Sequence, residues 1–137
     1  RKEVAELPKK YPECTMFGDL PAYGFYCRHV KGLRFSNVQL RTTAADLRHA
    51  MVFDDVENLD IDGLDAAFWP GGAPMLSLMQ TRGVIIRGCQ PRAKDGTFLK
   101  LAGDRSRNIA LIANDLNGVA KAADVAPDAP KDAIVLK

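Results

Sequence analysis

The sequence predicts an all-β fold, a right-handed parallel β-helix (solenoid) of about four coils. A four-residue pattern recurs in segments 30–33, 56–59, 81–84 and 106–109: a small or β-branched residue, a charged residue, Gly or Asn, and an aliphatic residue. The third positions, Gly32, Asn58, Gly83 and Asn108, are separated by 26, 25 and 25 residues. Apolar residues alternate with a period of two on both sides of each pattern, which is typical of short strands. A fixed repeat with two strands in each unit indicates a solenoid.

The Gly or Asn in each repeat predicts a sharp corner between two strands. These two residue types adopt the left-handed backbone conformation, with positive φ, more readily than the others. A left-handed corner at the same place in every repeat turns the chain by the same angle each time. Equivalent strands of successive coils are therefore expected to stack in parallel, about 4.8 Å apart.

Two other architectures are compatible with a repeat of this length. One is a leucine-rich or other solenoid, but leucine-rich repeats would place Leu at fixed positions where this chain has Arg34, Asp60, Ile85 and Ala110. Helical solenoids need apolar stripes with a period of 3.6, and the repeats contain none. The other alternative is a β-sandwich. The regular spacing favours the β-helix over both.

The alternation also predicts which side chains face the interior of the solenoid. Inward residues of successive coils lie above one another, which gives three expected stacks: Leu33/Leu59/Val84/Ile109, Phe35/Ile61/Ile86/Leu111 and Cys27/Phe53/Leu78/Gly103. Cys27 and Cys89 fall on inward positions, so we interpret them as small hydrophobic core residues. Cys14 lies in the irregular opening segment.

The chain divides into three parts. Residues 1–21 contain three prolines and no clean alternation, which predicts an irregular arm, and residues 22–117 are the coils. We expect residues 118–137 to form a cap and tail, with one or two helical turns before an extended end. Loops at 41–48, 68–74 and 91–96 are the places where a repeat scaffold usually carries binding surfaces.

The arm offers little to cover the first coil. An open coil presents unpaired backbone groups to other chains. We therefore expect the first coil to meet one of two partners, either upstream coils that precede Arg1 in a longer protein or the end of a second molecule in end-to-end self-association.

Composition and charge argue against several classes of function. The net charge of +2 is spread along 137 residues without a basic patch, so we expect no nucleic-acid partner. Apolar runs fall far short of the ~18 residues that a spanning helix needs, so we expect no membrane span. The three cysteines show no CxxC spacing and are distant in sequence from His29 and His49. We therefore expect neither a metal site nor a cofactor.

Several segments of the sequence resemble one known protein family. They are residues 11–13, 16–26, 28–31, 52–57 and 114–116, of which the stretch MFGDLPAYGFY at 16–26 is the most particular. Together they resemble the carboxyl-terminal part of bacterial polygalacturonase-like proteins, in the pectinase family of glycoside hydrolases. The likeness covers most of the chain. It implies hydrolysis of uronate-containing polysaccharide such as pectin, and a secreted or periplasmic protein, although the sequence itself leaves the compartment open.

The resemblance does not extend to the catalytic motifs of the family. Members use clustered aspartates in Asn-Thr-Asp, Gly-Asp-Asp, Gly-His-Gly and Arg-Ile-Lys motifs, and none of the four occurs in this sequence. Asp54 and Asp55 follow Phe53 instead of Gly. Neighbours on a strand point to opposite faces, so these two carboxylates cannot flank one glycosidic bond. We predict no catalytic residue here and expect the missing motifs upstream in a longer protein.

Five side chains are candidates for contact with a sugar. Trp69 lies in the loop after the second coil and offers a face for stacking on a pyranose ring. Its alternative role is to fold back over the edge of a coil. Tyr23, Tyr26, Arg28 and His29 offer aromatic and basic groups for an anionic polysaccharide, but such residues at strand ends are also commonly just solvated. Gly32 and the equivalent corner residues are interpreted as structural.

Two functional hypotheses follow. The first is a carboxyl-terminal segment of a pectinase-like glycoside hydrolase that shapes the groove for uronate-containing polysaccharide but lacks the catalytic aspartates. The second is a non-catalytic carbohydrate-binding or structural β-helix module.

Overall fold

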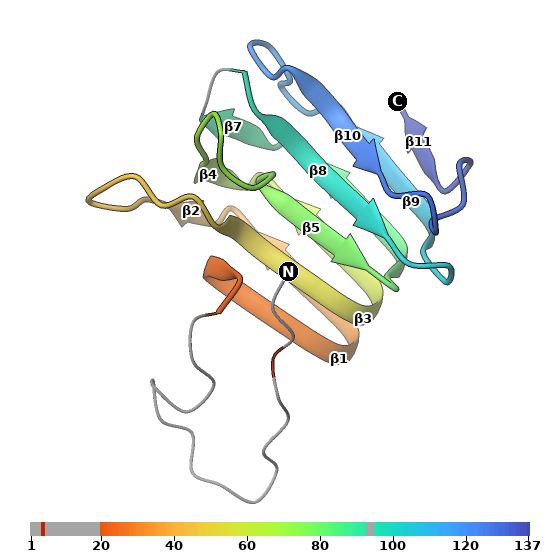
Figure 1. Ribbon diagram of the computed structural model, residues 1–137. Coiled ribbons are helices and arrows are strands. Elements are labelled where there is room, and N and C mark those ends of the chain that lie inside the picture. Colours follow the sequence, from red (N-terminus) through yellow and green to blue (C-terminus); the bar gives the residue numbers. More distant parts are fainter. Residues whose placement is uncertain (1–3, 5–19, 93–94) are drawn as a thin grey trace, which may run out of the picture.

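The chain winds into a β-solenoid of about five turns (Figure 1). The computed structural model describes residue 4, residues 20–92 and residues 95–137, and every regular element in these ranges is a strand. The strands are β1 (Ala22–Ser36), β2 (Gln39–Leu40), β3 (His49–Asp62), β4 (Asp65–Ala67), β5 (Leu76–Met79), β6 (Arg82–Arg87), β7 (Gln90–Arg92), β8 (Thr97–Ala102), β9 (Arg107–Ile112), β10 (Lys121–Val125) and β11 (Ile134–Leu136). The predicted parallel β-helix is confirmed, with one turn more than expected.

The strands form three faces that follow one another around each turn. β1 and β3 bend through a corner without a break, so their first halves lie on one face and their second halves on the next. In later turns the same corner separates β5 from β6 and β8 from β9. β5 pairs with the first half of β3, and β6 pairs with its second half. The short strands β2, β4 and β7 make the third face.

The predicted corners form one column along the solenoid. All four corner residues have positive φ, between 56° and 79°: Gly32, Asn58, Gly83 and Asn108. The strand registers place each of them above the one before, because Leu33, Leu59, Val84 and Ile109, which follow them, are aligned. The αL interpretation of the Gly/Asn repeat is thus confirmed.

Two further columns of left-handed residues complete the turn. One follows five residues later, with φ between 50° and 72° at Asn37, Gly63, Gly88 and Ala113. The other precedes the first column by three residues, at His29, Asp55 and Gln80. An asparagine next to this second column contacts the preceding turn. The side chain of Asn114 accepts a hydrogen bond from the backbone N–H of Cys89 at 2.9 Å and donates one to the carbonyl oxygen of Ile86 at 3.0 Å.

The core stacks follow the predicted registers with one correction. The stacks that begin at Leu33 and Phe35 are confirmed, and they continue into the last turn as Ile134 and Leu136. The stack that begins at Cys27 continues through Leu101 instead of Gly103. The expected alignment is wrong there because four residues, 103–106, separate β8 from β9, whereas two separate β5 from β6.

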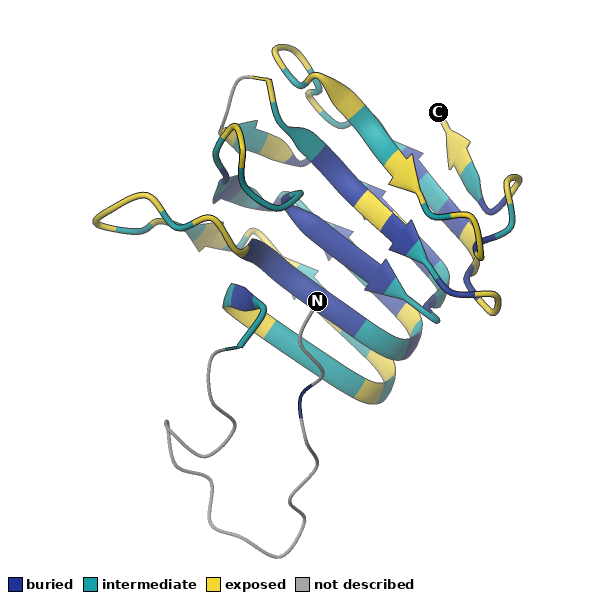
Figure 2. Cartoon of the chain, in the orientation of Figure 1, coloured by how far each residue is buried: buried dark blue, intermediate teal, exposed yellow. Residues whose placement is uncertain are grey.

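Burial is concentrated in the middle turns (Figure 2). Most of the large enclosed side chains come from β3, β5, β6 and β8, and include Phe53, Ile61, Leu78, Ile86 and Leu99. Each such side chain contributes about 1.5–3 kcal/mol relative to leaving it exposed. β1 at one end and β10 and β11 at the other are more exposed, because among the described strands each of them has a neighbour on one side only.

Residues 118–137 add a fifth turn and contain no helix, so the expected helical turns are wrong. β10 pairs in parallel with β8, and β11 pairs in parallel with β9. A helix of one or two turns is too short to be stable alone. The edges of β8 and β9 instead offer rows of backbone donors and acceptors that a strand can satisfy. The segment therefore extends the sheets.

The predicted arm, residues 1–21, lies almost entirely outside the described residues, and so does Cys14. Val4 is an exception: it is buried, and its carbonyl oxygen accepts a hydrogen bond from Nη1 of Arg28 at 2.5 Å. The carbonyl oxygen of Pro21 accepts a hydrogen bond from the backbone N–H of His49 at 3.3 Å. The chain therefore already contacts β3 as it enters β1.

A pair of substitutions at Asn108 tests the corner column. This residue is exposed and has φ of 56°. Asn108→Val places a β-branched residue in the left-handed region and should lower the free energy of unfolding by about 1–3 kcal/mol. Asn108→Gly keeps the conformation accessible and should change it by less than about 0.5 kcal/mol. Urea unfolding of both variants measures the difference, and equal values would contradict a role for the αL conformation.

Candidate functional site

Three outward side chains form an ionic cluster on the face made by β2, β4 and β7. Asp65 on β4 lies between Arg41, which follows β2, and Arg92 at the end of β7. Nη2 of Arg41 donates to Oδ1 of Asp65 at 2.9 Å. Arg92 contacts both carboxylate oxygens, with Nε 2.8 Å from Oδ1 and Nη2 3.0 Å from Oδ2. We call Arg41, Asp65 and Arg92 the arginine ladder.

The ladder holds its guanidinium groups in fixed orientations while leaving them accessible. Nη1 of Arg41 donates to the carbonyl oxygens of Leu40 and Asp65, at 3.0 and 3.1 Å. The side chains of Arg41 and Arg92 are nevertheless 45% and 54% exposed, against 17% for Asp65. Within the part of the chain that the structure describes, Nη1 of Arg92 has no acceptor. The ladder therefore presents oriented donors to solvent.

The charges of the ladder stabilise one another. Its hydrogen bonds to Arg92 lower the pKa of the Asp65 carboxyl from 3.8 to about 2, and Arg41 acts in the same direction against partial burial. Asp65 in turn raises the pKa of Arg92, with a smaller contribution from Asp115. Asp65 and Arg92 are therefore both charged at neutral pH.

An aromatic pair, Tyr23 and Trp69, lies beside the ladder. Trp69 packs edge-on against Tyr23, with ring centroids 6.4 Å apart and planes inclined by 64°. The Tyr23 hydroxyl donates to the carbonyl oxygen of Ala67, which lies on β4 with Asp65. Burial raises the pKa of Tyr23 to about 12, and Arg41 is close enough to oppose that rise. Both rings remain partly exposed. Trp69 thus folds back against the coil and still presents part of its surface.

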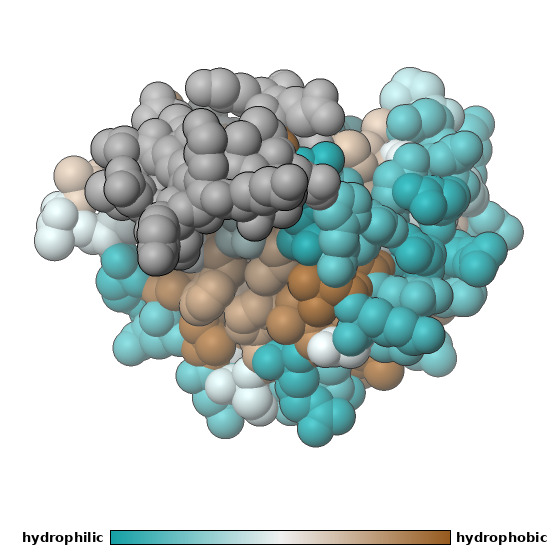
Figure 3. Space-filling view, turned by 90° about the horizontal axis from the view of Figure 1, so that it is seen from below, coloured by the Kyte–Doolittle hydropathy of each residue, from teal (hydrophilic) through white to brown (hydrophobic). Residues whose placement is uncertain are grey.

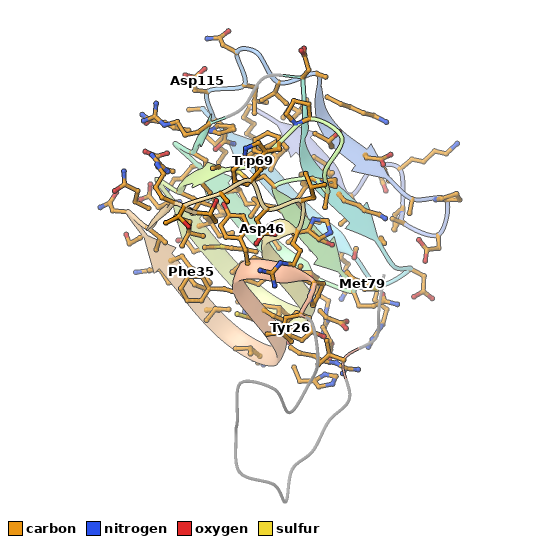
Figure 4. The ribbon with its side chains drawn as sticks, turned by 60° about the vertical axis from the view of Figure 1, so that its left-hand side comes forward. Tyr26, Phe35, Asp46, Trp69, Met79 and Asp115 are labelled. Carbon is orange, nitrogen blue, oxygen red and sulfur yellow. The ribbon has the colours of Figure 1, made fainter. Side chains whose placement is uncertain are left out.

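The other three sequence-predicted contact residues lie elsewhere. Tyr26, Arg28 and His29 belong to the first half of β1 and the corner after it, and Figure 4 shows Tyr26 at the β1 end, away from Trp69. Nε of Arg28 lies 3.5 Å from Oδ2 of Asp54, and Nδ1 of His29 lies 2.7 Å from Oδ2 of Asp55. The structure therefore brings Tyr23 and Trp69 together and separates them from this second group.

The carboxylates near that corner are held in ion pairs. Asp54 contacts Arg28, whereas Asp55 contacts His29 and also Arg82, whose Nη1 lies 3.0 Å from its Oδ1. The hydrogen bond from His29 is the largest of the effects that lower the pKa of Asp55. A glycosidase general acid needs a raised pKa instead. This environment suits structural carboxylates.

The arginine ladder was not identified from the sequence, yet the repeat contains a signal for it. Arg41 and Arg92 each stand nine residues after a corner, at Gly32 and Gly83, and Asp65 stands seven residues after Asn58. Extending the repeat alignment past the corner would have placed all three on one face. The bonds between them depend on side-chain orientation, which the spacing does not give.

The described cysteines behave as core residues. Cys89 is fully buried and Cys27 is partly buried, and neither is in a disulfide. Burial raises the pKa of both thiols, that of Cys89 to about 11, so both stay protonated at neutral pH. Across residues 20–92 and 95–137 no group of three or more His, Cys, Asp or Glu side chains is arranged to hold a metal ion. Nor do these residues contain a helix long and apolar enough to cross a membrane.

A shallow apolar hollow lies on the outer surface of β6, β9 and β11. It has a volume of about 440 Å³ and is lined by Ile85, Ala110 and Val135 among others. Ile85 is 38% exposed and Val135 is 49% exposed. Lys137 is the one charged side chain in its lining. The hollow therefore offers little with which to bind a charged sugar.

Comparison of the chain with models of known protein families, with curated proteins and with solved structures found no match. The protein is thus a β-solenoid with an oriented arginine pair on its third face and a partly exposed tryptophan in the loop after β4. Chemically, this arrangement suits binding of a planar anion next to a flat apolar ring.

The depressed pKa of Asp65 predicts a contribution to stability that depends on pH. Because the folded-state pKa lies below the ordinary value, the contribution is present above pH 3.8 and is lost as the pH falls toward 2. We expect Asp65→Asn to melt at a lower temperature than the unsubstituted protein at pH 7. The difference should shrink as the pH falls below 3.8 and vanish only below pH 2. Thermal unfolding of both proteins across this range measures it, and a difference independent of pH would contradict the ionic role.

Proposed function

We propose that this chain is a non-catalytic β-solenoid segment that binds uronate-containing polysaccharide on its β2–β4–β7 face. The observation that carries the proposal is the arginine ladder, with its accessible guanidinium groups fixed by Asp65. Residues 16–26 and the other segments that resemble pectinase-like hydrolases suggest the same class of substrate. In a longer hydrolase, such a segment would extend the groove that holds the polysaccharide.

The guanidinium groups supply recognition of the uronate carboxylate. Arginine is planar and binds carboxylates through two parallel N–H bonds, which is stronger and more selective than contact with a point charge. Asp65 removes much of the rotational freedom of Arg41 and Arg92 before a ligand arrives. Binding therefore costs less ordering of these side chains than it would for free arginines.

Trp69 supplies the apolar contact. Sugar rings present C–H groups on one face, and binding sites commonly combine an aromatic surface with a few placed polar groups. The contact with Tyr23 fixes the orientation of the indole ring. The partly exposed ring and the ladder together match a chain of pyranose rings that carries carboxylates.

Binding measurements on one pair of variants test this proposal. Arg92→Gln removes one guanidinium from the ladder, and Arg107→Gln removes the same charge from an exposed position on β9. A hydrogen bond to a charged group contributes about 1.5 kcal/mol, so Arg92→Gln should weaken binding of oligogalacturonate about tenfold. Isothermal titration calorimetry at fixed salt measures the affinity of each variant.

The control variant and a neutral ligand decide the outcome. Arg107→Gln should bind within about twofold of the unsubstituted protein, and a neutral glucan should bind to none of them. Equal losses in the two variants would mean that only overall charge matters. If the unsubstituted protein shows no affinity for oligogalacturonate, the proposal is wrong.

An activity assay tests the non-catalytic part separately. We expect this chain to release no reducing ends from homogalacturonan or rhamnogalacturonan, because Asp54 and Asp55 are held in separate ion pairs. Reducing ends formed by this chain, in proportion to its concentration, would contradict the proposal.

A further inference from the structure

The loop between β9 and β10 contains a chemically reactive pair of residues, Asn117 and Gly118. Figure 3 views the solenoid from the β1 end, where hydrophobic side chains gather, and this loop lies toward the other end (Figure 1). Asparagine is a labile residue, and it is most labile before glycine, because the absence of a Cβ lets the glycine nitrogen approach the amide. The chain has four other asparagines, none of them before glycine: Asn37, Asn58, Asn108 and Asn114.

The structure leaves both reacting groups of this pair accessible. Asn117 and Gly118 are exposed, and they form a tight turn in which the N–H of Val119 donates to the carbonyl oxygen of Leu116 at 3.1 Å. Within residues 20–92 and 95–137, neither the side-chain amide of Asn117 nor the backbone N–H of Gly118 has a hydrogen-bond partner. The turn belongs to no strand, so it opens locally at little cost in free energy. The glycine nitrogen and the amide are then free to meet.

Asn114, three residues earlier, provides the contrast within the same loop. Its side chain accepts a hydrogen bond from the N–H of Cys89 at 2.9 Å and donates one to the carbonyl oxygen of Ile86 at 3.0 Å. The nitrogen that follows it is also engaged, because the N–H of Asp115 donates to the carbonyl oxygen of Cys89 at 2.9 Å. The fold therefore restrains Asn114 and leaves Asn117 unrestrained.

Asn117 lies next to Arg92 of the arginine ladder. Gln90 and Asp115 each donate the same backbone hydrogen bond to the preceding turn of the solenoid, at 2.9 Å. Equivalent residues of consecutive turns lie about 4.8 Å apart, so Asp115 is beside Gln90. Asn117 and Arg92 each stand two residues further along, and they are therefore neighbours as well. Asp115 also contributes to the raised pKa of Arg92, which agrees with a loop that passes close to the guanidinium group.

We propose that Asn117 is a site of spontaneous deamidation, and that its product places a carboxylate against the arginine ladder. The backbone nitrogen of Gly118 attacks the side-chain carbonyl carbon of Asn117, and the bond from that carbon to the amide nitrogen breaks. The amide nitrogen leaves as ammonia and takes with it the proton of the Gly118 N–H. Water then opens the cyclic imide at one of its two carbonyl groups, which restores an N–H and gives aspartate or isoaspartate.

The new carboxylate changes the charge of the β2–β4–β7 face. It lies beside Arg92, whose Nη1 has no acceptor among the residues that the structure describes. An ion pair there occupies the donor that the proposed function offers to a uronate, and the added negative charge repels an anionic polysaccharide. The effect on binding rests on the proposed function, whereas the deamidation itself depends only on Asn117 and Gly118.

Mass spectrometry of the 137-residue protein after storage at mildly alkaline pH tests the modification. The protein should slowly gain the mass difference between an amide and an acid, and proteolysis should assign this gain to residue 117, with isoaspartate present. Asn117→Gln is the control, because its longer side chain closes a less favourable ring, and it should show no gain at this position. An unchanged residue 117, aspartate without isoaspartate, or a faster change at Asn114 would overturn the proposal.

Asn117→Asp reproduces one product and tests its effect on the ladder. A surface ion pair is weak, so this variant should bind oligogalacturonate about two- to fivefold less tightly than the unsubstituted protein, and Asn117→Gln should bind equally well. Equal affinities of the two variants, in a protein that does bind, would overturn the link to Arg92. If the unsubstituted protein does not bind oligogalacturonate, the proposed function fails, and the mass measurement alone decides whether Asn117 is modified.

Discussion

The left-handed corner that recurs in each turn is the constraint on which the rest of this structure depends. A residue with positive φ at Gly32, Asn58, Gly83 and Asn108 redirects the chain by the same angle between the first and second faces. Once the angle is fixed, equivalent strands must lie above one another, and parallel pairing follows. The cost of a left-handed residue, roughly 1–2 kcal/mol for a residue with a Cβ, falls most lightly on Gly and Asn, which explains their interchange in the column.

Stacking of the turns has different consequences for the side chains that face the interior and for those that face solvent. Inward positions repeat the same environment, so they accept any apolar side chain that fills the space, as Leu, Val and Ile do above Leu33. Outward positions bring side chains of neighbouring turns within bonding distance. Opposite charges there form pairs between turns, such as Arg34 with Asp60 and Arg41 with Asp65. The arginine ladder is one case of a general pattern on this solenoid.

The sequence predicted the fold from one column of corner residues, but it did not reveal the two other columns of left-handed residues. The second column contains Asn37, Gly63 and Gly88, but its last member is Ala113, which does not suggest a left-handed residue. The third column consists of His29, Asp55 and Gln80, three different residue types that share no sequence signal. The two extra residues before Arg107 shifted the expected alignment of Gly103, and the fifth turn was missed because an edge strand outcompetes a short helix. Of the candidate contact residues, Tyr23 and Trp69 meet, but that depends on the path of the loop after β4.

The same constraint indicates where variation, and therefore function, is possible. In the first three turns, each left-handed residue of the column that begins at His29 lies eight residues before the matching residue of the column that begins at Asn37. The pairs are His29 and Asn37, Asp55 and Gly63, and Gln80 and Gly88. Insertion there would break the register of every strand above. The rest of each turn, which includes β2, β4, β7 and the loops after them, has no such limit. Arg41, Trp69 and Arg92 all lie in this tolerant part, where side chains and loop lengths change without disturbing the column, and a binding surface is best placed there.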